Sequence, residues 1–282
     1  MSANAIEILE PLVRRLLASN PSPFTFTGTQ SFIVGRGEVA VIDPGPDLSE
    51  HVDALLAATA GEQVVAIVCT HTHRDHSPAS SAVAAATGAP IVGCAPLAMA
   101  DDGPRADDAF DVASAPDRVL GDGEQLAGSG WTLTAVATPG HTSNHLCFAL
   151  EEAGALFSGD HVMGWSTTIV SPPDGNMADY MASLERLLGR NDRVYYPAHG
   201  PAVEKPQKWV RGLLGHRRQR EGQILRELQR GVRRVPDMVA RMYGGVDPRL
   251  HPAAARSVLA HLIDLEARGL AVQNGEAWHA AA

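Results

Sequence analysis

The chain has 282 residues, of which 45% are apolar, 20% charged and 5% aromatic. This length suits one large domain, or one domain with a smaller one, and leaves ample room for a buried core. Three cysteines without a CxxC pair argue against a disulfide framework. Residues 77–100 carry no charge, but Pro78, Pro90 and Pro96 interrupt them, which argues against a membrane span. We therefore expect a soluble, cytoplasmic protein that does not contact a membrane.

Charge is unevenly distributed along the chain. Residues 1–200 hold 24 acidic side chains and 9 arginines, a balance of −15, whereas residues 201–282 hold 8 acidic and 14 basic side chains, a balance of +6. Together they give the net charge of −9. A shift of this kind is typical of a domain boundary. We place it between residues 204 and 205, which predicts a large domain over 1–204 and a small one over 205–282.

The larger domain alternates strand and helix signals. Apolar runs predict strands at residues 31–34, 38–42, 64–69, 91–93, 131–138, 145–150, 155–158 and 194–196, and helices over 80–87 and 177–188. Asp47 and Glu50 resemble a capping box that begins a further helix. Residues 101–117 contain six aspartates and predict an exposed loop. The alternation indicates an α/β fold built in layers.

The smaller domain has a different pattern. It begins with a long helix that we expect to break near Gly215, followed by a short helix that starts at Pro236. A third helix runs from about residue 252 to Gly269, a residue type favoured after helix ends. The dipeptide Asn274-Gly275 then predicts a β-hairpin. Helices followed by a hairpin indicate a winged-helix type module.

One hexapeptide, His-Thr-His-Arg-Asp-His at residues 71–76, concentrates candidate metal ligands directly after a predicted strand. His71 and His73 are two residues apart, so an extended backbone points both side chains the same way. Asp75 and His76 follow where the chain turns toward the next helix, and they can face a second ion. Imidazole nitrogens and carboxylate oxygens suit zinc, with bonds of about 2.0–2.2 Å. The hexapeptide therefore predicts a metal site.

Three further candidate ligands follow downstream, each at a predicted strand end beside glycine or proline. They are His141 in Pro-Gly-His-Thr, Asp160 in Ser-Gly-Asp and His199 in Ala-His-Gly. The neighbouring small residues let the backbone approach a crowded site closely. Alone, each has an ordinary explanation as a loop histidine or a turn carboxylate. Their occurrence in this order after the hexapeptide favours a shared metal site.

This series of motifs, spread over residues 71–200, resembles the metallo-β-lactamase superfamily of hydrolases. Segments over 164–170, 179–184, 196–202 and 216–221 resemble its beta-lactamase-like protein two subgroup, whose members carry a C-terminal winged-helix-like domain. The resemblance implies a four-layer αββα sandwich as the catalytic domain, with that small domain at residues 205–282. It also implies two Zn²⁺ ions, or other divalent metals, as cofactors. The implied ligands are His71, His73 and His141 for the first ion, Asp75, His76 and His199 for the second, and Asp160 as a bridge.

Such a site needs no serine or cysteine nucleophile. Two zinc ions that share a water lower its pKa from 15.7 to about 7, and the resulting hydroxide attacks the substrate. Asp75 and Asp160 contribute negative charge and are the expected catalytic carboxylates. Asp43 resembles the family's turn acid, and we expect it to orient the metal loop from behind the ligands. His145 either orients the site in the same way or simply begins a strand.

The subgroup implies cleavage of single-stranded RNA. Residues 205–234 hold ten basic side chains against two glutamates, which suits a polyanion, and Arg217, Arg218 and Arg220 are candidate substrate contacts. A small-molecule substrate is the first alternative, through a glyoxalase II-like thioester, lactone or other acyl hydrolase. The second alternative is a non-catalytic winged-helix protein that binds nucleic acid.

Overall fold

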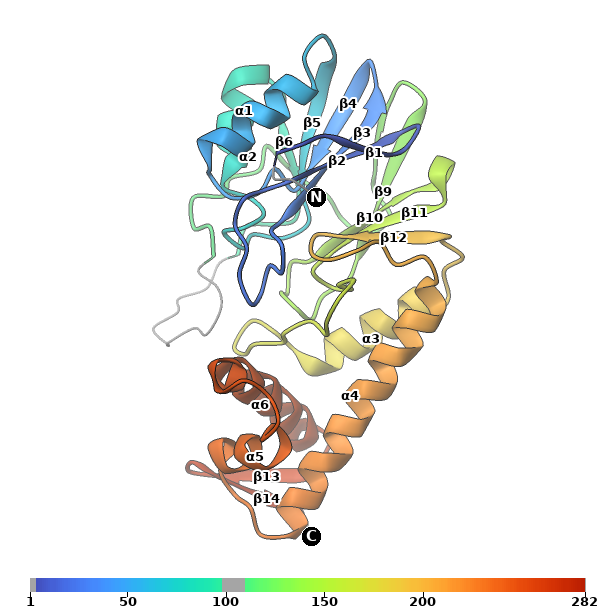
Figure 1. Ribbon diagram of the computed structural model, residues 1–282. Helices are drawn as coiled ribbons and strands as arrows, with labels where there is room; N and C mark the ends of the chain where they lie inside the picture. The colour runs from blue at the N-terminus through green and yellow to red at the C-terminus, as the bar shows by residue number, and fades with distance from the viewer. Residues whose placement is uncertain (1–3, 98–109, 282) are drawn as a thin grey trace. The chain divides into compact units, whose positions relative to one another are not determined.

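The protein contains two large β-sheets, in a computed structural model that describes residues 4–97 and 110–281 (Figure 1). The first sheet has seven strands in sequence order, antiparallel from β1 to β4 and parallel from β4 to β7. Its strands are β1 (Glu7–Glu10), β2 (Val13–Leu17), β3 (Gln30–Arg36), β4 (Glu38–Ile42), β5 (Gln63–Cys69), β6 (Ile91–Gly93) and β7 (Arg118–Val119).

The second sheet has five strands in the order β12-β11-β10-β9-β8. Only the β11–β12 pair of this sheet is parallel, so the carboxyl ends of these two strands lie at one edge of it. Its strands are β8 (Gln125–Gly128), β9 (Trp131–Ala137), β10 (Leu146–Leu150), β11 (Ala155–Gly159) and β12 (Val194–Pro197).

Helices separate and follow these strands. Helix α1 precedes β5, α2 precedes β6, α3 precedes β12, and α4 to α6 with a hairpin complete the chain. The α-helices are α1 (Ser49–Ala58), α2 (Ala79–Thr87), α3 (Met177–Leu188), α4 (Pro206–Gln229), α5 (Val235–Met242) and α6 (His251–Ala267). Short 3-10 helices lie at Glu151–Ala153 and Pro248–Leu250, and the hairpin strands are β13 (Ala271–Asn274) and β14 (Ala277–Ala280).

Alternation along the strands builds two apolar cores on the two faces of the first sheet. Phe32 and Val34 on β3 point into a core that they share with β9, β10 and β11 of the second sheet. Ile33, between them in the sequence, points to the opposite face, where it packs with residues of α1 and α2. Successive side chains of a strand face opposite sides, so a strand buried on both faces reads as a continuous apolar run.

The chain divides into two compact units, and both are discontinuous in sequence. The first comprises Met1–Thr138, Asn144–Ser166 and Asn191–Pro206. The second comprises Pro139–Ser143, Thr167–Arg190 and Gln207–Ala282, and a third apolar core lies within its C-terminal part, around Met238, Leu262 and Trp278. The boundary between residues 204 and 205 stays a prediction.

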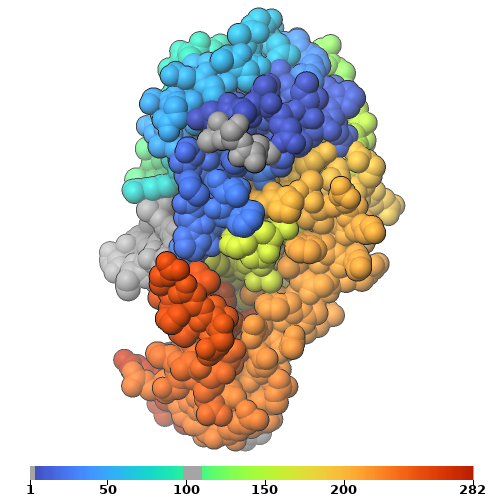
Figure 2. Space-filling view, in the orientation of Figure 1, coloured from blue at the N-terminus to red at the C-terminus, as the bar shows by residue number. Residues whose placement is uncertain are grey.

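Most predicted elements are present, and three expectations were wrong or incomplete. Helix α4 continues through Gly215 without the expected break, and it lies at the surface in Figure 2 (light orange). Leu48, not Asp47, precedes α1, and no side chain caps that helix. Strands β1, β2, β7 and β8 were not anticipated. Residues 101–109 of the expected acidic loop lie outside the described residues. Among the helices of the described part of the chain, none is long and apolar enough to cross a membrane.

Candidate metal centre

The histidine-rich hexapeptide begins directly after β5 and fills the connection to α2. Because β4 and β5 run parallel, their carboxyl ends lie side by side, and Asp43 just after β4 meets Thr70 just after β5. Asp43 adopts a φ of 47°, an uncommon backbone conformation for a residue other than glycine. Local strain at this position, held by the surrounding contacts, is typical of residues that organise a functional site.

Asp43 is 2% exposed and uses both carboxylate oxygens to hold the metal loop. Its Oδ1 accepts a hydrogen bond from the backbone N–H of Thr70 at 2.8 Å, and its Oδ2 accepts from the Thr70 hydroxyl at 2.8 Å. Oδ2 also lies 3.0 Å from Nδ1 of His76. When this nitrogen donates its hydrogen to Asp43, Nε2 of the same ring faces the site. The predicted orienting role of Asp43 therefore has a geometric basis, through Thr70 and His76.

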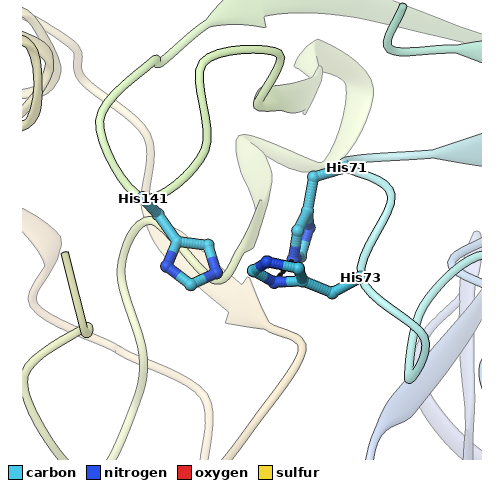
Figure 3. A group of neighbouring side chains, drawn as sticks. All are labelled: His71, His73 and His141. Carbon is cyan, nitrogen blue, oxygen red and sulfur yellow. Dashed lines mark hydrogen bonds between the residues drawn. The ribbon is translucent and has the colours of Figure 1, made fainter. Parts of the chain in front are cut away.

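The first cluster of candidate ligands consists of His71, His73 and His141 (Figure 3). One ligand atom of each residue lies within 4.8 Å of the others, and Nε2 of His71 is 3.0 Å from Nδ1 of His73. His141 comes from the turn between β9 and β10, and its Nδ1 donates to the carbonyl of Ile169 at 2.7 Å. With that nitrogen engaged, Nε2 of His141 is the atom available to a cation.

The second cluster brings together Asp75, His76, Asp160 and His199. His199 Nε2 lies 3.1 Å from an oxygen of Asp75 and 3.3 Å from an oxygen of Asp160. His76 Nε2 lies 3.3 Å and 3.6 Å from oxygens of the same two carboxylates. Asp160 also groups with His71 and His76, so it stands between the two clusters. All seven residues singled out in the sequence thus converge at this edge of the sheets.

The second sheet places Asp160 and His199 beside each other. Asp160 follows β11 and His199 follows β12, the parallel pair, so both stand at the carboxyl edge. Asp160 is further held by His145, whose Nε2 accepts a hydrogen bond from the Asp160 backbone N–H at 3.2 Å. Nδ1 of His145 then donates to the Thr138 hydroxyl at 2.9 Å. Of the two roles considered for His145, these contacts favour that of orienting the site.

Electrostatics couple the acids to the imidazoles. Burial acts to raise the pKa of Asp75 and Asp160, but the adjacent His76 and His199 lower both pKa values well below the ordinary range. Burial acts to lower the pKa of His199, but Asp160 and Asp75 raise it to about 10. Opposing burial in the same way, the neighbouring carboxylates raise the pKa of His76 well above its usual value. The two carboxylates therefore remain ionised and are stabilised by positive charge next to them.

The donor set fits a divalent cation. Two ligand atoms that each lie about 2.1 Å from a tetrahedral zinc are about 3.4 Å apart, close to the separations within both clusters. Nε2 of His76 is buried and has no partner in hydrogen-bond geometry among the described residues, although carboxylate oxygens surround it. A cation would bond both the imidazole lone pairs and the carboxylates. Imidazole nitrogens suit zinc, copper, iron and nickel, whereas calcium, magnesium and manganese favour oxygen ligands.

The three arginines proposed as substrate contacts lie in different environments. Arg217 is 3% exposed and donates to the carbonyl of Thr168. Arg218 is exposed and pairs with Glu185 at 2.9 Å. The Arg220 guanidinium stacks over the ring of Tyr243, 4.4 Å from its centre.

Sequence reasoning missed several residues that support the site. Thr70 and Thr138 carry hydroxyls that position Asp43 and His145, and each stands next to a motif that was identified. Gln30 gave no signal, since it lies far away in the sequence on β3. Its side-chain amide donates to the carbonyls of Pro197 and Gly200, at 3.0 Å and 2.6 Å, which fixes the turn that carries His199.

Comparison with known proteins places these residues in a family context. Residues 24–199 match the family model described as Metallo-beta-lactamase superfamily, and residues 235–278 match the Beta-lactamase associated winged helix domain. The two matches confirm the expected fold class, an α/β sandwich of this superfamily followed by a small winged-helix domain.

Individual relatives agree with the family models. The chain is 33% identical over 232 residues to the Beta-lactamase-like protein 2 homolog of Caenorhabditis elegans, which covers 79% of this chain and 73% of that protein. It is 32% identical to the atrochrysone carboxyl ACP thioesterase of Aspergillus fumigatus, over 79% of this chain and 67% of that one. A metallo-beta-lactamase family protein from Thermus thermophilus shares the fold, with a TM-score of 0.78, 24% identity and coverage of 97% and 100%.

Proposed function

Because the chain belongs to the metallo-beta-lactamase superfamily, whose members are hydrolases, we propose that it is a hydrolase that uses two zinc ions. The observation that carries the proposal is the convergence of seven buried or nearly buried donors into two overlapping clusters. Nothing in ordinary packing brings five imidazoles and two carboxylates together, because buried charged groups are costly unless they are paired or bind metal. Residues 1–204 form the proposed catalytic domain.

The proposed ligands follow the two clusters. His71, His73 and His141 would hold the first ion, and Asp75, His76 and His199 the second, with Asp160 between them. Asp43 supports the assignment, because it holds His76 with Nε2 turned toward Asp75 and Asp160. His145 supports it from the other side, through the backbone of Asp160.

When bound, two divalent cations supply an acidified water and an electrophile for the substrate oxygen. The protein's own contribution is electrostatic and geometric. Asp75 and Asp160 stay ionised at neutral pH and balance positive charge at the site, as the directions of their pKa shifts indicate. Thr29 donates its hydroxyl to Asp75 at 3.3 Å, which fixes the carboxylate orientation. Asp75 is the residue placed to receive or deliver a proton during bond cleavage, because it is less buried than its partners.

An acyl thioester is the substrate class that we place first. Relatives named as thioesterases support it, among them the Aspergillus protein that is 32% identical to this chain over 228 residues. The pairing of Arg218 with Glu185 and the burial of Arg217 also remove two of the cations proposed to contact RNA. A thioester is a small neutral group whose carbonyl two cations can polarise without a long basic groove.

Single-stranded RNA is the second candidate, and the basic face of α4 favours it. Besides the paired Arg218, three exposed cationic side chains stand on this helix, at Lys208, Arg211 and Arg226. Side chains of this type bind phosphates in a way that weakens steeply as salt rises. RNA binding that is insensitive to salt would therefore argue against use of this helix.

One substrate panel separates the candidates. The zinc-loaded protein is assayed with an acyl thioester, a lactone, a β-lactam and a single-stranded RNA oligonucleotide. We expect thioester hydrolysis to be fastest. Faster RNA cleavage would reverse the order, and zinc-independent RNA binding without hydrolysis of any substrate would support the non-catalytic alternative.

Two substitutions test the site itself. We expect Asp160→Ala and His76→Ala to abolish hydrolysis while far-ultraviolet circular dichroism stays unchanged. Asp47→Ala, in the exposed part of the loop after β4, is the matched control and should remain active. An Asp160→Ala protein with normal turnover would exclude the two-metal proposal.

A further inference from the structure

A buried arginine of helix α4 is connected to the turn that carries His141. Arg217 is 3% exposed and donates a hydrogen bond to the backbone carbonyl of Thr168. The carbonyl of the next residue, Ile169, accepts from Nδ1 of His141 at 2.7 Å. The backbone at Thr168 and Ile169 therefore accepts a hydrogen bond from Arg217 and another from His141, which orients the imidazole. All of these residues belong to the second compact unit.

A second route joins the same arginine to the same turn. The Arg217 guanidinium lies over the ring of Tyr180 on α3, 5.1 Å from its centre. A Cβ added to Gly140 would stand 2.3 Å from Cα of Tyr180, so glycine is required for this close approach. The Gly140 carbonyl also accepts from the backbone N–H of Asn176 at 2.9 Å. The turn is thus packed directly on the helix that Arg217 covers.

The environment of Arg217 lacks the usual compensation for a buried cation. Among the described residues it forms no ion pair with a carboxylate, and its Nε has no hydrogen-bond partner. Burying a guanidinium without an anion is unfavourable, so a purely structural position would more readily hold an apolar side chain. The hydrogen bond to Thr168 and the contact with the Tyr180 ring are the interactions that hold the Arg217 guanidinium in this position.

We propose that Arg217 is a positioning residue for the metal ligand His141. It holds the Thr168–Ile169 backbone and the Tyr180 ring so that Nδ1 of His141 stays bonded and Nε2 faces the cation. This inference rests on the proposed function, since it takes His141 as a ligand. Arg217 of the basic helix therefore supports the candidate ligand His141 and does not contact the substrate.

The test measures metal binding by the Arg217→Met variant. Methionine keeps an apolar stem of similar length and removes the guanidinium group. Chelator competition titrates zinc, and cobalt substitution gives an absorption spectrum that reports ligand geometry. We expect one of the two sites to weaken by about 10-fold to 100-fold, as for losses behind a ligand, with an altered cobalt spectrum. Arg211→Met, an exposed arginine of the same helix, is the matched control and should bind as the unchanged protein does.

Arg217→Lys keeps the charge with a single donor group, and it should recover part of the affinity. If Arg217→Met does not fold, Arg217→Lys decides alone, and it should weaken one site several-fold. Equal affinities at both sites in the variants and the unchanged protein would overturn the inference, as would equal weakening of both sites. Failure of the unchanged protein to bind metal would instead overturn the proposed function.

Discussion

At the scale of single residues, Asp43 has the clearest supporting role, because one carboxylate holds two parts of the metal loop. Asp43→Asn keeps the shape but replaces one acceptor by a donor. The new donor opposes either the Thr70 backbone N–H, if it stands at Oδ1, or both the Thr70 hydroxyl and Nδ1 of His76, if it stands at Oδ2. We expect zinc affinity to fall by about 10-fold to 100-fold, as for other partners of metal ligands. Zinc titration against a chelator measures this, and Asp47→Asn is the matched control. Unchanged affinity would show that His76 is oriented without Asp43.

Gly159 is the last residue of β11, directly before Asp160, and the space around it allows no side chain. It has a φ of 48°, and an added Cβ would stand 2.6 Å from Nε2 of His145 and 2.8 Å from the Thr70 hydroxyl. For Gly159→Ala we expect about 1–2 kcal/mol of lost stability from the backbone, and about 1–3 kcal/mol more from overpacking. Gly61→Ala, with a φ of 81° and open space around it, isolates the backbone contribution. Equal losses in urea unfolding would refute the crowding argument.

The candidate metal ligands could be identified from the sequence one by one, whereas the residues that support them could not. The seven candidate ligands stand in compact motifs beside glycine and proline, so sequence alone identifies them. Thr70 and Gln30 are ordinary residues whose role depends on strand pairing. Gln30 reaches a turn 170 residues away, and only the tertiary fold brings them together.

At the scale of elements, α6 carries a buried histidine that should make stability depend on pH. His261 is 3% exposed, and neither ring nitrogen has a hydrogen-bond partner among the described residues. Burial, together with the nearby Arg217, His216, Arg268 and Arg220, lowers its pKa to about 3. Below pH 6.5 the unfolded chain therefore binds a proton that the folded helix rejects. Stability is fully present above pH 6.5 and is lost as the pH falls toward 3.

His261→Leu removes this dependence. We expect the free energy of unfolding of the unchanged protein to fall, through this group, by up to about 1.4 kcal/mol for each pH unit within that window. Urea unfolding at several pH values between 7 and 4 should give a shallower slope for the variant. His279→Gln, at a partly exposed position of β14, serves as the control and should leave the slope unchanged. Parallel slopes in all three proteins would contradict a neutral buried His261.

Elements were predictable where their periodicity was strong. The apolar face over residues 177–188 defines α3 to the residue, and the run at 64–69 matches β5. Strand β2 was not predicted, and Arg14 and Arg15 interrupt its apolar residues. Arg14 is in fact 5% exposed, with its guanidinium bonded to the carbonyl of Ala58 and paired with Glu62 at 2.6 Å. A buried arginine reads as a surface residue until its partners are known.

At the scale of the whole molecule, both charge and packing distinguish the C-terminal part of the chain from the rest. The acidic excess lies in residues 1–200, and two of those acids are proposed metal ligands. The apolar core around Trp278 shares no residue with the cores at the first sheet. The stability of the C-terminal module therefore depends on a core of its own. The proposed metal centre depends instead on the strands β4, β5, β11 and β12.

Metal removal should consequently act on one part of the molecule. A ligand that binds only the folded state at a thousand times its dissociation constant stabilises it by about 4 kcal/mol. We expect chelation to increase hydrogen exchange in the segments that carry the proposed ligands, at residues 70–77, 139–145, 159–162 and 197–200. Exchange in α6 and the hairpin should change little, because their core contains none of these residues. Mass spectrometry of peptides measures both regions in one sample, and Asp160→Ala should respond less to chelator. An equal increase in both regions would mean that the chain unfolds as one cooperative unit, with the C-terminal module dependent on bound metal.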